Sequence, residues 1–369
     1  MKDKINVGIF FGGRSGEHEV SLLSARSIIF NLDPSKYNLI EVGITREGKW
    51  LSGERVLDAF QKGATAHLQP VAMFPQAGDH HLYRLIDGQY HPQIHLDVVF
   101  PVLHGTFGED GTLQGFLELI GIAYVGAGVL ASSVGMDKGL FKSVLRSYEI
   151  PVLDHQLITR RQVEEDLEQV IRMIESALSY PIFVKPANLG SSVGITKCRN
   201  RSDLGEGLYE AARYDRRIVV EQGLERPREI EVSVLGNDQP VVSIPGEVVP
   251  GEDFYTYSAK YLSDSSELLI PAPLSDEQTR EIQRIAVQTY RAIDCSGMAR
   301  VDFLLDRQTE RVYVSEVNTI PGFTQISMYP KLWEASGLPY TKLLDRLIEL
   351  AFERKADRDR TEFHYRREE

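Results

Sequence analysis

The sequence predicts an α/β protein of more than one domain, and three observations lead to that fold class. The chain has 369 residues, more than one ordinary domain holds, so two or three domains are expected. Near the N-terminus a β-branched and aromatic run, NVGIFF, leads through the glycine-rich GGRSGEHE into the helix-like VSLLSARSIIFNL. A second strand-like run, LDVVFPVLHG, is again followed by a polar loop and a helix-like TLQGFLELIG. This alternation is typical of α/β domains.

The bulk composition excludes several classes of protein. Hydrophobic residues make up 42% of the chain and charged residues 25%, which indicates a globular protein with a sizeable core. The net charge of −12 argues against nucleic acid or an anionic membrane as partner, because both favour a basic surface. The two cysteines, Cys198 and Cys295, form no CxxC pair, which favours a reducing compartment. With no signal-peptide pattern and no apolar run near the roughly 20 residues that span a bilayer, we expect a cytoplasmic protein.

The order of strand-like and helix-like segments suggests domain boundaries. We expect an N-terminal α/β domain over 1–126, a central domain over 127–220 and a C-terminal domain over 221–357. The long polar stretch before the helix DEQTREIQRIAVQTYRAI predicts a lid loop at about 246–275, since loops of that length inside a domain are usually functional or disordered. The charged stretch from Arg354 onward is expected to be solvated, with 358–369 as a tail.

Two strand-like segments near the C-terminus, MARVDFLLD and RVYVSEVNT, predict an antiparallel hairpin. If its turn centres near Thr309, Arg300 faces Asn318 and Asp302 faces Glu316, all on one side of the sheet. Two carboxylates and an amide oxygen are ligands that Mg²⁺ prefers, so these side chains are candidate metal ligands. The alternative is an exposed polar face with one cross-strand salt bridge. The opposite face is expected to pack in the core: Val301, Phe303, Tyr313 and Val317.

A second group of segments could bind phosphate. FVKPANLGSSVG is a strand followed by a loop of small residues, whose backbone N–H groups could converge on an anion beside Lys185. GMDK places Lys138 at a predicted helix start, and VVEQGL places Glu221 at a strand end, where it could bind an adenine edge. Taken singly, each is better explained as an ordinary loop or a solvated strand end.

Taken together and in order, these segments resemble the D-alanine–D-alanine ligases of the ATP-grasp superfamily. The matching segments extend from about residue 5 to about residue 353, so the resemblance covers nearly the whole chain. GEHEVS and GFTQIS distinguish this family from other ATP-grasp enzymes. The other segments that carry the resemblance are PVLHGTFGEDGTLQGFLEL, GMDK, VKPANLGSSVG, VVEQGL, FYTYSAKY, ARVDF and EVNTIPG.

The resemblance implies a three-domain ATP-grasp fold, with an N-terminal open-sheet α/β domain and ATP between the central and C-terminal α+β domains. It implies ATP and two Mg²⁺ (or Mn²⁺) as cofactors, D-alanine as both donor and acceptor, and a homodimer. The product would be D-alanyl-D-alanine for peptidoglycan synthesis, formed through an acyl phosphate. The residues that it implies for metal ions are Asp302, Glu316 and Asn318, and those for nucleotide are Lys138, Lys185, Glu221, Leu224, Glu229 and, on the lid, Lys260. The segment before Glu229 is one residue longer than the family pattern.

The resemblance also implies residues that bind the amino acids. Glu19 would bind the ammonium of the first D-alanine; the alternative is a carboxylate that favours a helix N-terminus, which Glu17 fits better. Ser191 and Tyr261 would bond with Glu19 and hold the lid closed. Ser327 would hold the carboxylate of the second D-alanine.

Three positions are implied for the reaction itself. Arg300 and the backbone near Gly322 would stabilise the oxyanion. His104 would orient or deprotonate a substrate group, unless it is a structural loop histidine.

Other functions remain open from the sequence. A D-alanine–D-lactate ligase or another ATP-grasp carboxylate–amine ligase would share the scaffold. GIFFGGRSG resembles a dinucleotide-binding fingerprint, but its spacing is not G-x-G-x-x-G and it leaves the acidic hairpin face unexplained. A non-catalytic nucleotide-binding module would not need the full set of lysine, arginine and acidic residues.

Overall fold

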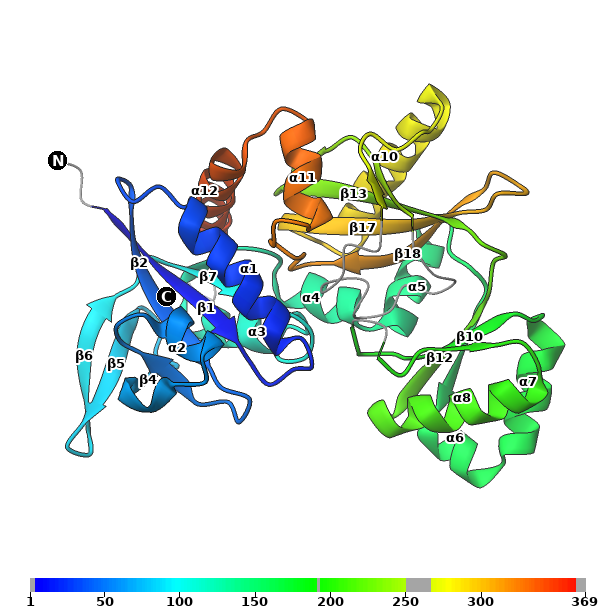
Figure 1. The fold of residues 1–369 in the computed structure, drawn as a ribbon, viewed down its shortest axis with the longest axis horizontal. Helices are drawn as coiled ribbons and strands as arrows, with labels where there is room; N and C mark the ends of the chain where they lie inside the picture. The colour runs from blue at the N-terminus through cyan, green and yellow to red at the C-terminus, as the bar shows by residue number, and fades with distance from the viewer. Residues whose placement is uncertain (1–3, 191–192, 250–266, 363–369) are drawn as a thin grey trace, which may run out of the picture.

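Three β-sheets organise the chain, one at the left, one at the upper right and one at the lower right of Figure 1. The structure, a computed structural model, describes residues 4–190, 193–249 and 267–362. Within those ranges no helix is both long enough and apolar enough to cross a membrane. The sheets follow one another along the chain in the order of the three expected domains.

The N-terminal sheet has eight strands in the order β6-β5-β4-β3-β2-β1-β7-β8. The strands β2, β1, β7 and β8 pair in parallel, and pairing is antiparallel from β2 outward to β6. Every residue of β7 is buried, as is usual for a parallel strand covered on both faces. The strands are β1 (Ile5–Gly12), β2 (Tyr37–Ile44), β3 (Trp50–Ser52), β4 (Gln69–Ala72), β5 (His81–Ile86), β6 (Gln89–His95), β7 (Val98–Val102) and β8 (Ala123–Tyr124).

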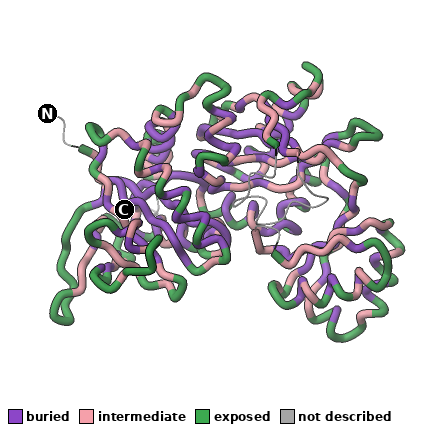
Figure 2. The backbone as a smooth tube through the Cα atoms, in the orientation of Figure 1, coloured by how far each residue is buried: buried purple, intermediate pink, exposed green. Residues whose placement is uncertain are grey.

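Helices cover both faces of this sheet, and one of them comes from the far end of the chain. The local helices are α1 (His18–Asn31), α2 (Val56–Gln61), the short 3-10 helix η1 (Thr65–His67) and α3 (Thr112–Ile120). The last helix, α12 (Tyr340–Arg358), shares a hydrophobic core with β1 and β7 through Leu343, Leu347 and Leu350. Figure 2 shows the buried residues concentrated along these strands and the inner helix faces.

The central sheet is antiparallel, in the order β11-β10-β12-β9. Alternation along β10 turns Ile182 and Val184 into a core with the helices and leaves Phe183 and Lys185 on the opposite face. The elements are β9 (His155–Thr159), α6 (Arg160–Glu165), α7 (Leu167–Ala177), β10 (Ile182–Pro186), β11 (Thr196–Cys198), α8 (Arg201–Tyr214) and β12 (Arg217–Gln222).

The C-terminal sheet follows the order β16-β15-β13-β17-β18, with β14 paired to β13. Helix α10 begins with a capping box between Ser275 and Gln278 and buries Ile282, Ile285 and Ala286 on the sheet, as its periodicity predicts. The elements are β13 (Arg228–Gly236), β14 (Val241–Val242), β15 (Gly246–Val249), β16 (Glu267–Leu269), α10 (Asp276–Ala292), β17 (Gly297–Leu305), β18 (Val312–Asn318) and α11 (Met328–Ala335).

Helices α4 (Val129–Met136) and α5 (Lys138–Ser147) pack on the C-terminal sheet, although they precede the central sheet in sequence. Phe141 and Leu145 of α5 share a core with α10 and β17. Asp137 separates the two helices and caps α5 by accepting from the Leu140 N–H at 2.8 Å. In Figure 1, α5 lies between the C-terminal and central sheets.

The predicted hairpin is confirmed, with one local change. In the β17–β18 pair Arg300 lies opposite Asn318 and Asp302 lies opposite Glu316. The register then shifts by one residue, a β-bulge that turns Val314 into the core in place of Tyr313, which is half-buried. The expected polar face is kept because the bulge lies on the turn side of Glu316.

Strands flank the expected lid, and a helix includes the first residues of the expected solvated stretch, which the sequence analysis did not predict. Residues 250–266 of the lid lie outside the described residues, but its flanks pair as strands β15 and β16. Helix α12 continues to Arg358, so Arg354 is not part of a solvated tail. The Arg354 guanidinium donates to the Tyr124 carbonyl at 3.1 Å and lies 4.1 Å from the centre of the Tyr124 ring.

Candidate active site

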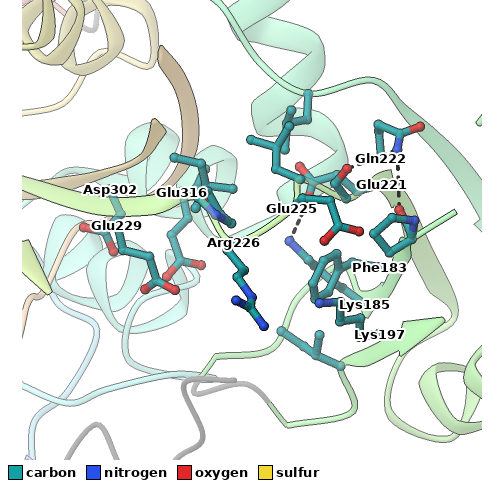
Figure 3. Close-up of a pocket in the computed structure, with 18 of the residues that line it drawn as sticks. Phe183, Lys185, Lys197, Glu221, Gln222, Glu225, Arg226, Glu229, Asp302 and Glu316 are labelled. Atoms are coloured by element: carbon teal, nitrogen blue, oxygen red, sulfur yellow. Dashed lines mark hydrogen bonds and ion pairs between the residues drawn. The ribbon is translucent and has the colours of Figure 1, made fainter. Parts of the chain in front are cut away.

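A cavity of about 560 Å³ opens between the central and C-terminal sheets. Figure 3 shows acidic side chains of the C-terminal sheet on one side and basic and aromatic side chains of the central sheet on the other. Such a charged cavity between two domains is a usual place for a small polar ligand. The predicted residues that line it are Lys185, Glu221, Leu224, Glu229, Asp302 and Glu316.

The acidic side of the cavity is the polar face of the β17–β18 hairpin. Arg300 donates from Nε to Asp302 Oδ1 at 2.7 Å and from Nη2 to Asp302 Oδ2 at 2.6 Å. Asn318 donates to Asp302 Oδ2 at 3.0 Å, and Arg300 Nε also lies 3.0 Å from Glu231 Oε2. Arg300 and Asp302 are only 16% and 14% exposed, so this face is not the exposed surface of the alternative interpretation.

The donor set of this face suits a hard cation that also binds substrate oxygens. Asp302, Glu316 and Asn318 offer two carboxylates and one amide oxygen. Among the residues that the structure describes, no three His, Cys, Asp or Glu side chains are grouped as a metal site. Mg²⁺ that bridges substrate phosphates usually takes only one or two carboxylates from the protein.

The basic side of the cavity is built around the buried carboxylate of Glu221. Lys185 donates to one oxygen of Glu221, and Lys142 forms an ion pair with the other. Burial by itself would raise the pKa of Glu221, but the two lysines lower that pKa to about 2. Glu221 is therefore an anion throughout the physiological pH range.

Not all of the remaining nucleotide-site predictions line this cavity. Leu224 and Glu229 line it, and Figure 3 shows Glu229 beside Asp302 and Glu316. Lys138 is the first residue of α5, as predicted, and donates to the Leu189 carbonyl at 2.6 Å. This contact brings Lys138 to the loop of small residues that follows β10.

A second, smaller cavity of about 50 Å³ lies between the N-terminal domain and the hairpin. Glu17 and Glu109 enter it from the N-terminal domain, and Arg300, Glu316 and Asn318 enter it from the hairpin. A Cβ on Gly190 would lie 2.7 Å from Glu17 Oε2, so a glycine is needed for the loop to approach this carboxylate.

The structure places Glu17, and not Glu19, at this cavity. The Glu17 residue is only 8% exposed, whereas the Glu19 side chain is 60% exposed and forms a surface ion pair with Arg46 at 2.7 Å. Helix α1 begins at His18, and its rotation on the sheet directs Glu19 outward. The position expected for Glu19 is therefore corrected, and Glu17 takes its place as the candidate for an ammonium group.

His104 is held in place by two hydrogen bonds. Its Nδ1 lies 3.0 Å from the Ile320 carbonyl oxygen, which can only accept, so Nδ1 carries the hydrogen and Nε2 accepts from the Ser24 hydroxyl at 3.0 Å. Burial lowers the pKa of His104 to about 4, so the imidazole is neutral at pH 7. This geometry favours the structural interpretation, in which His104 joins α1 to the loop after β18.

The loop after β18 brings Ser327 and Gly322 together. Ser327 Oγ accepts from the Thr324 N–H at 3.0 Å and lies 2.8 Å from Thr324 Oγ1. A Cβ on Gly322 would lie 2.8 Å from Ser327 Oγ, so the hydroxyl packs directly against the Gly322 backbone. Ser191, Lys260 and Tyr261 lie outside the described residues.

Four site residues were not found from the sequence. Glu231 could have been found, because it shares a strand face with Glu229 two residues away. Lys142 lies one helical turn after Lys138 on α5, a spacing that puts both on one face. Glu17 and Glu109 depend on loop geometry, for which the sequence offers no local signal.

Comparison with known proteins identifies the family. The family description "D-ala D-ala ligase N-terminus" matches residues 6–127, and "D-ala D-ala ligase C-terminus" matches residues 144–349. The chain belongs to the D-alanine–D-alanine ligase family. The expected ATP-grasp fold is thereby confirmed, and the relatives are named D-alanine–D-alanine ligases.

Relatives of this family align over almost their whole length. The chain is 48% identical to a D-alanine–D-alanine ligase of Natranaerobius thermophilus and 49% identical to one of Heliobacterium modesticaldum, in both cases over 97% of each chain. The D-alanine–D-alanine ligase structure from Coxiella burnetii is 38% identical, with a TM-score of 0.82 over 96% of each chain. The VanG D-Ala:D-Ser ligase of Enterococcus faecalis is 35% identical, with a TM-score of 0.84 over 95% of this chain and 100% of that one.

Proposed function

We propose that the protein joins two D-alanines to D-alanyl-D-alanine at the expense of ATP, through an acyl phosphate. The observation that carries the proposal is the cavity between the sheets in a chain of this family. It combines an anionic hairpin face of Asp302 and Glu316 with Lys185 and Glu221 on the facing sheet. A nucleoside triphosphate is bound by both kinds of surface, one that holds its metal-bound phosphates and one that holds its base.

Each side of the cavity would bind one part of ATP. Lys138 and Lys185 would neutralise phosphate oxygens, together with Lys260. Glu221 would accept from the adenine amino group, Leu224 would pack on the base and Glu229 would bind the ribose. The supporting observations are the positions of Lys185, Glu221, Leu224 and Glu229 on the cavity wall.

The hairpin residues fit two Mg²⁺ or Mn²⁺ ions. Asp302, Glu316 and Asn318 would hold them, since all three offer oxygen ligands on one partly buried face. Glu17 and Glu316 also bring negative charge here, and together with burial they raise the pKa of Glu109 to about 8, so Glu109 is mostly protonated at pH 7. When bound, the ions would supply charge neutralisation for the transferring phosphate.

The chain's own residues would position the two amino acids. Glu17 would bind the ammonium of the first D-alanine, whose carboxylate attacks the γ-phosphate. Ser327 would bind the carboxylate of the second D-alanine, whose amine then attacks the acyl carbon. Arg300 and the backbone at Gly322 would stabilise the oxyanion of that step. Ser191 and Tyr261 would close the lid and so exclude water.

We also propose where the protein acts, how it assembles and which acceptor substrate it uses. Because the reaction consumes ATP and supplies peptidoglycan synthesis, we place it in the cytoplasm, and we expect a homodimer. D-alanine is proposed as the acceptor over D-lactate because the curated relatives carry the D-alanine–D-alanine name. The D-Ala:D-Ser name of the VanG relative makes acceptor choice a point to measure directly.

One assay tests the proposal. Purified protein is incubated with ATP, Mg²⁺ and D-alanine, and both phosphate and dipeptide are measured; D-serine, D-lactate and L-alanine are offered in parallel as acceptors. We expect one phosphate per dipeptide, loss of both with EDTA, and no turnover with L-alanine alone. Equal turnover with L-alanine, or turnover that survives EDTA, would contradict the proposal, and an ester as the main product would favour the D-lactate alternative.

A further inference from the structure

Lys142 is a buried cation beside the proposed adenine site. Its side chain is only 1% exposed, and it does not line the 560 Å³ cavity. It lies behind Glu221, with which it forms an ion pair, and its Nζ is 3.5 Å from the Ser315 carbonyl oxygen. It therefore cannot contact a ligand in that cavity directly.

Glu221 and its two lysine partners differ in how deeply their side chains are buried. Glu221 and Lys142 are almost completely buried, whereas Lys185 is 15% exposed and lies on the cavity wall. A buried carboxylate with no counter-ion is strongly unfavourable and would take up a proton. If Lys185 turns to the phosphates of a nucleotide, only Lys142 remains to balance Glu221.

We infer that Lys142 is a positioning residue that keeps Glu221 ionised and correctly oriented to accept a hydrogen bond from the 6-amino group of adenine. This inference rests on the proposed ATP site. Lys142 thereby allows Lys185 to exchange from Glu221 to phosphate without leaving an uncompensated buried charge. It makes the site selective for a 6-aminopurine over a 6-oxopurine, which presents a carbonyl oxygen to Glu221.

An apolar side chain in place of Lys142 could pack against the core, but it could not balance the charge of Glu221. Burying an ion pair rarely stabilises a fold more than packed hydrophobic side chains do. Here α5 packs Phe141 and Leu145 into the core, so the helix is already anchored without Lys142. The charge acts on Glu221 and on the backbone next to Glu316, not on the docking of α5.

The test compares ADP with IDP, which differ at the purine 6-position. Affinity for each, with Mg²⁺ present, is measured by calorimetry on the full-length protein. We expect wild type to prefer ADP by tenfold or more, because a charge-assisted hydrogen bond is replaced by repulsion with IDP. We expect Lys142→Met to weaken ADP ten- to hundredfold and IDP less than threefold, so that the preference largely disappears.

Two further variants separate positioning from a general effect. Lys197→Met removes a cation that lines the cavity and lies 5.9 Å from the centre of the Phe183 ring; it should weaken ADP and IDP equally. In a Glu221→Gln background, Lys142→Met should change ADP affinity less than threefold, because Lys142 acts through Glu221. This second comparison carries the test if Lys142→Met alone does not fold, as judged by circular dichroism and thermal unfolding.

Each outcome decides the inference. Equal weakening of ADP and IDP by Lys142→Met, unchanged affinity, or a full tenfold effect of Lys142→Met in the Glu221→Gln background would overturn it. Those results would leave the proposed ligase activity intact, since wild type would still bind ADP. A wild type that binds neither nucleotide would overturn the proposed ATP site, and this inference with it.

Discussion

Two enclosed carboxyl groups, each at a different cavity beside the polar face of the β17–β18 hairpin, have opposite pKa shifts. Lys142 and Lys185 contact Glu221, and they lower its pKa to about 2 against the effect of burial. Glu109 lies at the small cavity beside Glu17 and Glu316, and burial together with these acids raises its pKa to about 8. Burial acts in the same direction on both groups, so the charge of the neighbours decides the sign.

This difference indicates what each region lacks before ligands bind. The Glu221 region already contains its cations, and it is ready to accept a neutral hydrogen-bond donor such as an amino group. The Glu109 region has three carboxyl groups around a cavity with Arg300 and Lys138, and Arg300 is already bonded to Asp302. Additional positive charge, such as a substrate ammonium or a metal ion, would relieve that repulsion.

The largest expected effect comes from removing one negative charge of the hairpin. Glu316→Gln keeps the size of the side chain but weakens the proposed metal site, so we expect kcat to fall at least a hundredfold, which corresponds to several kcal/mol of transition-state stabilisation. The measurement is steady-state phosphate release with D-alanine across a Mg²⁺ titration, in which higher Mg²⁺ should restore part of the rate.

The matched control is Glu310→Gln, an exposed residue at the turn of the same hairpin. Its activity should stay within twofold of wild type. A Glu316→Gln protein with normal turnover and a changed melting temperature would instead indicate that Glu316 serves only the fold.

A smaller effect should distinguish Glu17 from Glu19. If the anionic cavity binds the first D-alanine, Glu17→Gln should raise KM for that D-alanine ten- to hundredfold, because a charge-assisted hydrogen bond is lost. Glu19→Gln is the matched control: its surface ion pair with Arg46 contributes at most about 1 kcal/mol to stability, and KM should not change. The reverse result would return the ammonium site to Glu19.

The part of the site that could be predicted from the sequence follows from regular periodicity. The alternation along two strands predicted that Asp302 lies opposite Glu316, and the GMDK segment predicted a helix start at Lys138, where α5 begins. The bulge that exchanges Tyr313 for Val314 was not predictable, because either register keeps an apolar residue in the core.

The errors concern positions that depend on packing between segments far apart in the chain. Glu17 and Glu19 lie two residues apart at a helix start, and only the rotation of α1 on its sheet decides which one enters the cavity. Lys142 is buried because α5 lies between the C-terminal sheet, on which it packs, and β12 of the central sheet, which carries Glu221. Such contacts have no local signature in the residue pattern.

The smallest expected effect is a pH dependence of stability that tests the Glu109 half of the comparison. Because the folded-state pKa of Glu109 is raised from 4.5 to about 8, its contribution to stability is fully present below about pH 4.5 and is lost as the pH rises through about 8. Glu109→Gln cannot ionise, so it should not show this loss. It does lose one acceptor oxygen, since Glu109 accepts from the Gly105 N–H at 2.7 Å and from the Ile320 N–H at 3.2 Å. We therefore expect the variant to be the less stable protein at pH 5 and to gain on wild type by about 1 kcal/mol or more between pH 5 and pH 9. Denaturant unfolding in EDTA measures this difference without metal ions, and Glu310→Gln, which is exposed, should show no such trend. A constant difference between Glu109→Gln and wild type across this range would mean that Glu109 is ionised at neutral pH, and that the surplus of negative charge at this cavity is balanced before any ligand binds.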